Sequence, residues 1–501
     1  MNFRQNKSII LFILGFGIFM FTRRSEILPS IQIAIVIAPV LILRFIRIQS
    51  TKKGIFLTLL GFLLSMNIAL WGLFTSKDAG AVLTFNILRS SLLAILYFLP
   101  YMIDRLVYPK LKKINFVPTL TFPIIVTAMF FLSSLEGPFD GGSAKGVFVY
   151  GPQIFKQIAS VTGMWSFIFI YSWLASIINF SWENKFSWKK IQKYFLAYII
   201  TIIFIYSYGF IKISFSKDLK AETVKIAAVV LLPEDGKPVS MEEVFKYKKV
   251  SNYDETISKI ENLTEIAASN DAKIVSFQEF AIVINEENRS RLLQKFKEIA
   301  IENNIYLSVS YAYVVKEGKG KNLHLLIDTE GNFLLDYQKR FLWGFGDHGE
   351  TAVFWKGAEV IQSTETPYGQ IGISICRDMN FSRFIRQAAK QNVDIMLSPS
   401  YDYPRSTKPS YTLRSIEYGF SFVRPTYNGV SFVEDYNGKV LKQMNMDDAG
   451  NGIMYLDVPT KGVKTVYSVI GDLLGWFCVL GALLLIIFST INWKRDDKRL
   501  E

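Results

Sequence analysis

Cysteine and histidine are scarce in this chain, which has only two residues of each type among 501. Cys478 lies inside a late apolar run, so we expect no disulfide bond between it and Cys376. Two cysteines cannot build a disulfide framework or a cysteine-rich metal site, and His324 and His348 are too few for a histidine-rich zinc site. The sequence therefore predicts neither a metal nor a cofactor.

Charged residues are also few, at 20% of the chain, whereas half of the residues are hydrophobic and 15% are aromatic. A soluble protein of this length rarely has such a composition. The formal net charge is +13, but no basic stripe interleaved with aromatic residues is present, which argues against a nucleic-acid partner. Many lysines and arginines instead lie between apolar runs, as they do in the loops of membrane proteins.

Eight apolar runs are candidates to cross a bilayer, which takes about 20 mostly apolar residues in a helix. They are Ser8–Phe21, Ile27–Leu43, Ile55–Phe74, Ala81–Ile103, Phe116–Leu135, Ile158–Phe180, Tyr194–Ile213 and Val466–Ile491. The first run lacks a small-residue cleavage site before Arg23 and a second run follows at once. We therefore interpret it as a retained helix and not as a cleaved signal peptide.

The charge of the loops predicts the orientation of these helices. Three basic loops fall on one side if the helices alternate, namely Arg44–Lys53, Asp104–Lys113 and Glu183–Lys193. The positive side of a membrane protein is cytoplasmic. Seven spans then place the next segment outside the cytoplasm, and the eighth returns the tail. The pair Arg23 and Arg24 is the exception to this pattern.

The segment that follows the seventh span has an ordinary globular composition, with short β-branched runs between helical stretches. The predicted strands are Val224–Leu232, Ala272–Phe277, Tyr306–Val314, Leu323–Asp328, Gln370–Cys376, Val393–Ser398, Val430–Glu434 and Ile453–Val458. The predicted helices are Asn252–Asn270, Asn288–Asn303, Phe381–Asn392 and Tyr411–Phe420. This alternation indicates an α/β fold with a largely buried sheet, and Asn437–Gly438 predicts a hairpin turn.

We accordingly divide the chain into four parts. Residues 1–215 form a membrane domain of about seven helices, and residues 216–465 form an extracytoplasmic α/β domain. Residues 466–492 form a C-terminal transmembrane helix, and residues 493–501 form a cytoplasmic tail.

Three side chains of the α/β segment could perform chemistry together. Cys376 ends a strand-like run, where helix-end N–H groups would lower the pKa of a thiol and stabilise an oxyanion. Glu279 ends the run Ile274–Phe280 and could act as a general base, and Lys339 could hold negative charge. Each residue alone has a plainer interpretation: a small buried side chain, an exposed strand-end carboxylate and a solvated lysine.

Together these residues resemble the Glu–Lys–Cys triad of the nitrilase, or carbon–nitrogen hydrolase, superfamily. The matching motifs are YQKRFLWGFGD, GQIGISIC, RSIEYGFSFVRPTYNG, and DYNGKVL followed by GIMYLDVP. The superfamily implies an αββα sandwich. The layout of seven spans before the domain and one after it resembles the apolipoprotein N-acyltransferase family.

Some positions depart from that family. Cys376-Arg377-Asp378 stands where the family has Cys-Tyr-Glu, and Asp347 stands where it has a second glutamate. The resemblance implies that Asp347 orients Lys339 or Glu279. Asp378 could support Arg377 or cap the helix that follows. Glu417, Arg424 and Asn428 match the family pattern, and we interpret them as structural.

The resemblance implies a monomeric enzyme of the bacterial inner membrane. It would transfer an acyl chain from a phospholipid, through a Cys376 thioester, to the N-terminal amine of a lipoprotein. Phe341, Trp343, Phe345 and Tyr401 are predicted to contact the lipid, although core packing would explain the first three equally well. A membrane-tethered hydrolase that uses the same triad, and a degenerate domain that only binds a ligand, are the alternatives.

Overall fold

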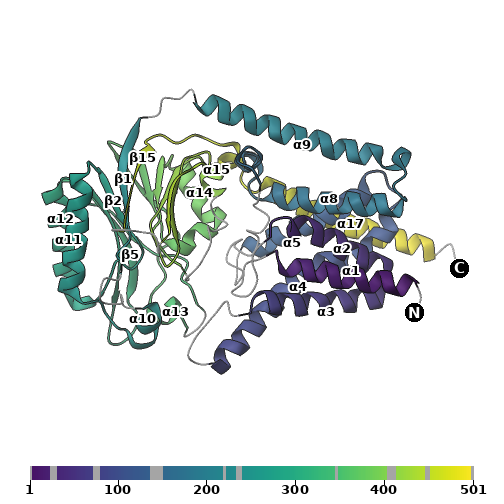
Figure 1. Cartoon of the computed structure of the whole chain (residues 1–501), viewed down its shortest axis with the longest axis horizontal. Helices are drawn as coiled ribbons and strands as arrows, with labels where there is room; N and C mark the ends of the chain where they lie inside the picture. The colour runs from purple at the N-terminus through teal and green to yellow at the C-terminus, as the bar shows by residue number, and fades with distance from the viewer. Residues whose placement is uncertain are drawn as a thin grey trace. The chain divides into compact units, whose positions relative to one another are not determined.

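The computed structural model describes residues 3–22, 31–71, 79–135, 151–217, 222–232, 240–344, 348–402, 413–445 and 452–497 (Figure 1). The chain forms two compact units. The helical unit comprises residues 1–210 and 472–501, and the globular unit comprises residues 211–471.

The helical unit consists of long apolar helices in the part of the chain that is described. They are α1 (Phe3–Met20), α2 (Ala34–Ile48), α3 (Thr51–Ala69), α4 (Ala79–Leu111), α5 (Val117–Leu135), α8 (Trp165–Glu183), α9 (Trp188–Lys217) and α17 (Leu473–Asp497). Two short helices, α6 (Gln153–Lys156) and α7 (Ala159–Thr162), precede α8. Every apolar run of the sequence therefore contributes a helix.

Five of the described helices are long and apolar enough to cross a membrane. They are Thr51–Ala69, Asn86–Leu111, Val117–Leu135, Trp188–Phe215 and Leu473–Ile491. A sixth span is possible if Gln153–Thr162 and Trp165–Glu183, which meet at an angle of 114°, are counted together. The apolar part of α1, Lys7–Met20, is shorter.

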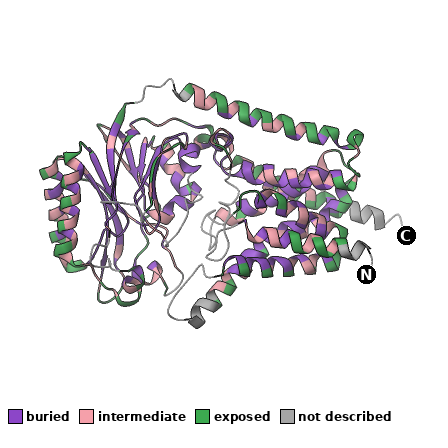
Figure 2. Ribbon diagram, viewed as in Figure 1, coloured by how far each residue is buried: buried purple, intermediate pink, exposed green. Residues whose placement is uncertain are grey.

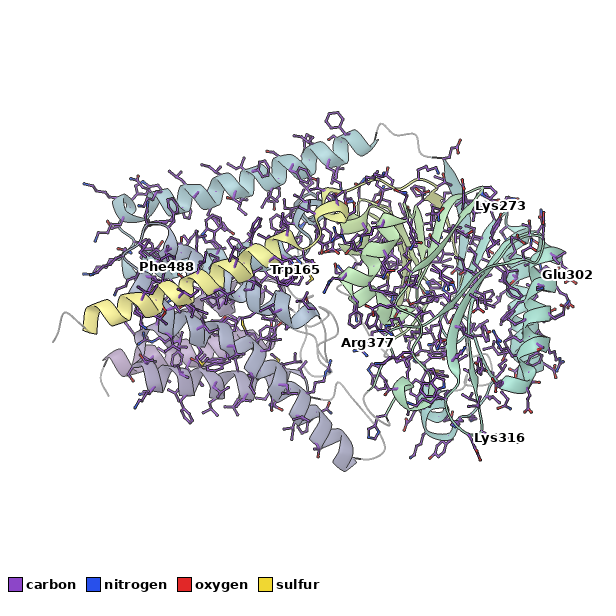
Figure 3. The ribbon with its side chains drawn as sticks, turned by 180° about the vertical axis from the view of Figure 1, so that it is seen from behind. Trp165, Lys273, Glu302, Lys316, Arg377 and Phe488 are labelled. Carbon is purple, nitrogen blue, oxygen red and sulfur yellow. The ribbon has the colours of Figure 1, made fainter. Side chains whose placement is uncertain are left out.

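Large apolar side chains lie exposed on these helices, which is unusual for a surface in contact with water. Phe204 is 64% exposed and Phe488 is 55% exposed, and Phe488 points away from α17 in Figure 3. In the globular unit the labelled side chains at the surface are instead charged, as at Lys273, Glu302 and Lys316. Long apolar helices with exposed apolar side chains are typical of a membrane protein.

The last apolar run is divided into two helices. Val466–Ile470 forms the separate short helix α16, which ends at Gly471 with a φ of +61°. A left-handed backbone at this position suits glycine and stops the helix. The long helix α17 therefore begins at Leu473, seven residues after the predicted start at Val466.

The globular unit contains two large sheets. The first has the order β15-β1-β2-β4-β5-β6, with β3 paired to β4, and the second has the order β14-β13-β11-β9-β8-β7. Strands of the first sheet are β1 (Thr223–Val229), β2 (Ile274–Phe277), β3 (Ile282–Asn285), β4 (Tyr306–Val314), β5 (Lys321–Ile327), β6 (Phe333–Gln338) and β15 (Ile453–Pro459). Strands of the second are β7 (Gln362–Thr366), β8 (Gly369–Ile373), β9 (Ile395–Leu397), β11 (Ser421–Arg424), β13 (Val430–Glu434) and β14 (Val440–Asn445).

The alternation of side chains along β1 shows how the layers pack. Val224, Ile226 and Ala228 join the core cluster that also contains the second sheet, while Ala227 and Val229 join the cluster beneath two helices. Those helices are α11 (Tyr253–Ser269) and α12 (Arg289–Asn303). Helices α14 (Ser382–Lys390) and α15 (Arg414–Tyr418) flank the second sheet (Figure 1). Because successive strand residues face opposite sides, both faces of the first sheet are buried (Figure 2).

The predicted fold class is therefore confirmed: an α-helical membrane region and an αββα sandwich. The strands Tyr306–Val314 and Val430–Glu434 have the predicted bounds. The predicted turn at Asn437–Gly438 joins β13 and β14, and Gly438 has a φ of +71°. The sequence did not reveal β3, since its four residues follow β2 closely.

Candidate active site

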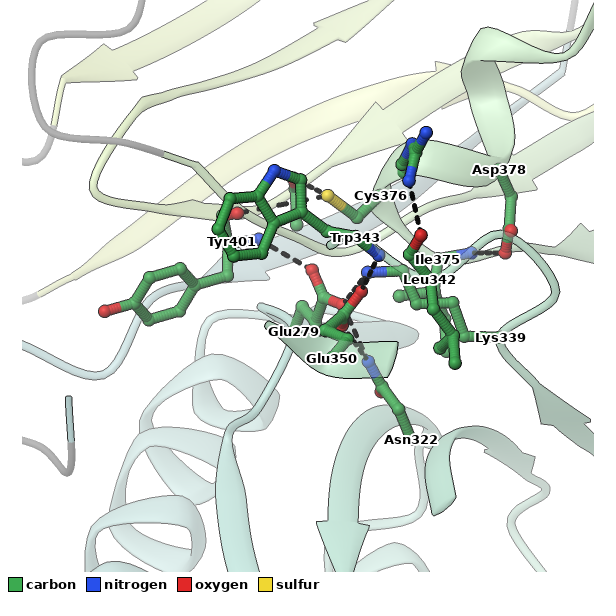
Figure 4. A network of polar contacts seen from close by, with 12 residues as sticks. Glu279, Asn322, Lys339, Leu342, Trp343, Glu350, Ile375, Cys376, Asp378 and Tyr401 are labelled. Carbon is green, nitrogen blue, oxygen red and sulfur yellow. Dashed lines mark hydrogen bonds and ion pairs between the residues drawn. The ribbon is translucent and has the colours of Figure 1, made fainter. Parts of the chain in front are cut away.

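Each of the three candidate residues follows the end of a strand. Glu279 lies two positions after β2, Lys339 directly after β6, and Cys376 three positions after β8. The two sheets thus deliver residues distant in sequence to one place (Figure 4). The backbone of Tyr401 touches two of them, because its N–H donates to Glu279 Oε2 at 2.9 Å and its carbonyl lies 3.9 Å from Cys376 Sγ.

Lys339 lies between two carboxylates. Its Nζ is 2.7 Å from Glu279 Oε1 and 2.8 Å from Glu350 Oε1. The Asn322 amide donates to the same two oxygens, at 2.8 and 3.0 Å. Two donors and two acceptors therefore form a closed network that fixes the position of the Lys339 ammonium.

The network is almost completely shielded from water. Glu279 is 1% exposed, and Lys339 and Glu350 are each 2% exposed. Burial raises the pKa of Glu279, and the neighbouring Glu350 raises it further, although Lys339 and Asn322 act in the opposite direction. Burial alone would lower the pKa of Lys339, but the two carboxylates outweigh it and raise that pKa. Lys339 is therefore a permanent cation beside a carboxylate suited to accept a proton.

Cys376 has an unusual backbone. Its φ is +47°, in the left-handed region that costs a side chain about 1 kcal/mol or more, and its N–H donates to the Pro399 carbonyl at 2.8 Å. The short 3₁₀ helix Cys376–Asn380 begins at this residue. This turn directs the thiol toward Ser400, whose Oγ lies 3.0 Å from Sγ.

The electrostatic environment of this thiol corrects one prediction. The sequence favoured a lowered pKa for Cys376, whereas burial and then the Glu279 carboxylate raise the pKa of the thiol to about 12. Lys339 and Arg424 only partly offset these two effects. The resting thiol is therefore protonated, and nucleophilic attack requires a base that removes its proton.

The second acid of the site is a residue that the sequence analysis missed. Asp347, predicted to support Lys339, lies outside the described residues. Glu350, at the start of α13 (Glu350–Val353), pairs with Lys339, and its other oxygen accepts from the Trp343 N–H at 2.6 Å. Gly344 and Gly349, which lie between Trp343 and Glu350 in the sequence, both have positive φ values. No motif in the sequence marked Glu350 as a partner of Lys339.

Asp378 joins the loop after Lys339 to the loop around Cys376. It is buried, and its carboxylate accepts from Tyr337 Oη at 2.6 Å, from Phe341 N–H at 2.8 Å and from Ile375 N–H at 3.1 Å. Burial raises the pKa of Asp378 to about 6. Its observed role is thus to hold two active-site loops together. Arg377 extends to the same loop, where its guanidinium donates to the Leu342 carbonyl.

The residues predicted to contact lipid differ in their positions. Phe341 stacks on Phe381, with 3.5 Å between ring centroids, and packs against the core. Its position therefore fits the alternative interpretation, which was core packing. Trp343 is half-buried and stacks on Phe245. Tyr401 is half-buried beside Glu279. Phe345 lies outside the described residues.

Arg424 extends the polar network behind the thiol. It is fully buried, and its Nη2 donates to Ser400 Oγ at 2.6 Å and to Asp402 Oδ1 at 2.8 Å. The Ser400 hydroxyl also lies 2.9 Å from Asp402, so its single proton can be donated either to that carboxylate or to Cys376 Sγ. Ser400 is the second residue of the site that the sequence analysis missed.

The arrangement combines a nucleophile, a base and a fixed cation. Such a set can attack a carbonyl carbon, stabilise the oxyanion that results and form a thioester. A general base is required because the thiol is protonated at rest. Among the described residues, no group of three or more His, Cys, Asp or Glu side chains could hold a metal ion.

Comparison with known proteins finds relatives of the globular unit. Residues 227–467 match the carbon–nitrogen hydrolase family. The chain is 24% identical over 203 residues to the deaminated glutathione amidase of Dictyostelium discoideum, covering 36% of this chain and 69% of that protein. A crystal structure of an amidase from Nesterenkonia sp. is also similar, with 17% identity and a TM-score of 0.40, covering 52% of this chain and 97% of that one.

Two further relatives are named as apolipoprotein N-acyltransferases. The apolipoprotein N-acyltransferase of Rickettsia prowazekii is 23% identical over 361 residues, covering 67% of this chain and 68% of that protein. Apolipoprotein N-acyltransferase 1 of Treponema denticola is 26% identical over 181 residues, covering 34% of this chain but only 32% of that protein. The Rickettsia alignment is longer than the span 227–467, so the chain carries a carbon–nitrogen hydrolase domain and is similar to apolipoprotein N-acyltransferases beyond that domain.

Proposed function

We propose that this protein is an N-acyltransferase that moves an acyl chain from a phospholipid to the N-terminal amine of a lipoprotein through a thioester on Cys376. The observation that carries the proposal is the buried Glu279–Lys339–Glu350 cluster beside a protonated thiol. The apolar helices and the similarity to apolipoprotein N-acyltransferases support a lipid donor and a lipoprotein acceptor.

The first half-reaction forms the thioester. Glu279 takes the thiol proton as Sγ attacks the ester carbonyl of the phospholipid, and the carbonyl oxygen becomes an oxyanion. Lys339 and the Arg377 backbone N–H stabilise this oxyanion. When the C–O bond breaks, Glu279 returns the proton to the departing alkoxide, and a lysophospholipid leaves.

The second half-reaction transfers the acyl group to nitrogen. The neutral amine attacks the thioester carbonyl and gives one proton to Glu279. The C–S bond then breaks, and the thiolate regains a proton from Glu279, which restores the starting enzyme. One nucleophile serves both steps, so the kinetics should be ping-pong.

We further propose that the globular unit lies on the extracytoplasmic side of the bacterial inner membrane. The three basic loops Arg44–Lys53, Asp104–Lys113 and Glu183–Lys193 support this orientation, because basic loops remain cytoplasmic. Substrates carried by the outer leaflet would then meet the domain directly.

The test is incubation of the purified full chain with a labelled phospholipid and a diacylated lipopeptide. We expect triacylated product, and an acyl mass on Cys376 that persists until the lipopeptide is added. Glu279→Ala, Lys339→Ala and Cys376→Ala should each abolish the product. Rapid loss of the acyl group to water without amine would instead identify a hydrolase. Product formation by Cys376→Ala would contradict the proposal.

A further inference from the structure

Residues of two basic loops of the helical unit, together with Glu183 at the start of the third, line one cavity of about 390 Å³. Its walls are Arg44, Arg47, Arg105, Tyr108, Pro109, Lys112 and Glu183. They come from the final turns of α2 and α4 and from the C-terminal end of α8. The charge of the loops predicts that basic residues lie on one side of a membrane. It does not predict that these residues line the same cavity.

Cations outnumber anions in this cavity. Arg47 is 3% exposed and forms a two-pronged ion pair with Asp104, at 2.9 Å for both contacts. Glu183 is the only carboxylate among the lining residues, and it lies 3.7 Å from Arg44 and 3.8 Å from Arg47. Glu183 and Asp104 therefore balance Arg44 and Arg47, whereas Arg105 and Lys112 form no ion pair with a carboxylate among the described residues.

Two buried donor atoms at the cavity have no hydrogen-bond acceptor in the part of the chain that the structure describes. They are Arg47 Nη1 and Arg105 Nε. Arg105 uses its Nη2 on the Gln49 carbonyl at 2.8 Å, and the Arg47 guanidinium lies 3.6 Å from the centroid of the Tyr108 ring. A buried guanidinium donor without an acceptor costs free energy that a bound anion would remove.

We propose that this cavity binds a phosphate oxyanion, most naturally the headgroup of an anionic phospholipid. The volume falls within the range of small-ligand sites, and guanidinium groups match phosphate geometry. The site lies where apolar helices end, which is the depth of lipid headgroups, and Arg44 contacts the Trp182 ring at 5.3 Å. A cation at a helix C-terminus is ordinary, but such placement does not explain buried donors that lack an acceptor.

The test measures lipid binding and not catalysis, so it is independent of the proposed acyl transfer. The full chain in neutral detergent is mixed with phosphatidylglycerol or phosphatidylcholine, and retained lipid is counted by native mass spectrometry. We expect preferential retention of phosphatidylglycerol. In the Arg44→Gln/Lys112→Gln variant its apparent Kd should rise at least about tenfold, since each basic group near a lipid surface contributes about fivefold in affinity.

The matched control is Lys52→Gln/Lys113→Gln, which removes the same charge from exposed positions of the same loops. Its apparent Kd should change less than twofold. Lys112 is exposed, so Lys112→Gln alone keeps the comparison valid if the double variant folds poorly. Equal losses in both double variants would overturn the proposal, because they would reflect diffuse charge, and equal retention of the two lipids would overturn it as well.

A second arm separates the two sources of phosphate. Inorganic phosphate at millimolar concentration is added to the complex with phosphatidylglycerol, and chloride at equal ionic strength is the control. Displacement by phosphate alone indicates a site that recognises the free oxyanion. No displacement by either salt indicates that the glycerolipid is required. Equal displacement by both salts would contradict a specific site.

Discussion

Each of the two units contains a cluster of ionic side chains, and the two clusters have an excess of opposite charge. In the globular unit, two carboxylates share the single ammonium of Lys339. In the helical unit, Glu183 and Asp104 pair with Arg44 and Arg47, and Arg105 and Lys112 add two more positive charges. The excess charge decides what each cluster can do.

An excess of carboxylate raises the proton affinity of the site, because two like charges cannot both remain ionised cheaply in a dry environment. This suits a base that collects a proton from a thiol. An excess of guanidinium instead attracts an external anion. The Coulomb interaction between ionic side chains therefore serves proton transfer in one unit and, as we propose, anion binding in the other. The experiments that follow test this contrast.

The largest effect should follow Cys376→Ala, which removes the nucleophile. We expect at least about a 10³-fold loss of acyl transfer, because no other group can form the thioester. The unfolding temperature should change little, since this site acts through chemistry. Cys478→Ala is the matched control, because Cys478 lies on α17, and it should retain activity. Comparable losses of acyl transfer in both variants would contradict a special role for Cys376.

The next largest effect should be on stability, in the helical unit. Asp104→Ala removes both hydrogen bonds between the buried Arg47 side chain and a carboxylate and leaves only Glu183, at 3.8 Å, which costs about 3–5 kcal/mol. Denaturant unfolding of the full chain in detergent measures the loss. Replacement of both partners, as in Arg47→Met/Asp104→Leu, should recover most of it, whereas the exposed Glu365→Ala should be neutral. An unchanged free energy of unfolding in Asp104→Ala would contradict the contrast between the two clusters.

Glu350→Gln should reduce kcat/KM about 10–100-fold, because Lys339 loses one of its two anionic partners. The variant should also lower the pKa of Glu279, since the negative neighbour that raises it is gone. Glu279 must be deprotonated to act as a base, so the acidic limb of the pH profile should shift to lower pH. Glu365→Gln should leave the profile unchanged. A shift of the acidic limb to higher pH would contradict the conclusion that Glu350 raises the pKa of Glu279.

The smallest effect should follow Ser400→Ala. The thiolate loses a hydroxyl donor at 3.0 Å, which should slow thioester formation about three- to tenfold. The rate of alkylation of Cys376 by iodoacetamide, measured against pH, should show a higher thiol pKa than in the unmodified protein. An unchanged alkylation profile would assign Ser400 to packing.

Much of the architecture could be predicted from local patterns. Period-two runs such as Tyr306–Val314 gave a strand with the observed bounds, and the apolar runs gave helices. The triad residues were predicted because each stands in a short motif. The carbon–nitrogen hydrolase match over residues 227–467 spans all three residues, and their roles stay a prediction.

The surroundings of the triad could not be predicted in the same way. Glu350 lies eleven residues after Lys339, and no local pattern in the sequence indicates that the two side chains meet. The direction of the Cys376 pKa shift depends on burial and on Glu279, neither of which is visible in the residues next to the cysteine.

The sequence by itself determined where the apolar helices and the α/β alternation lie, because these depend on local periodicity, and it predicted a nucleophile, a base and a cation from motifs within a few residues. Only the tertiary structure decided which acid lies beside Lys339, whether the thiol is protonated, and that Glu183 and residues of two basic loops share one cavity. Those properties depend on burial and on contacts such as Glu279 with Tyr401, across 122 positions. Desolvation and Coulomb interactions act through space and are therefore set by the fold.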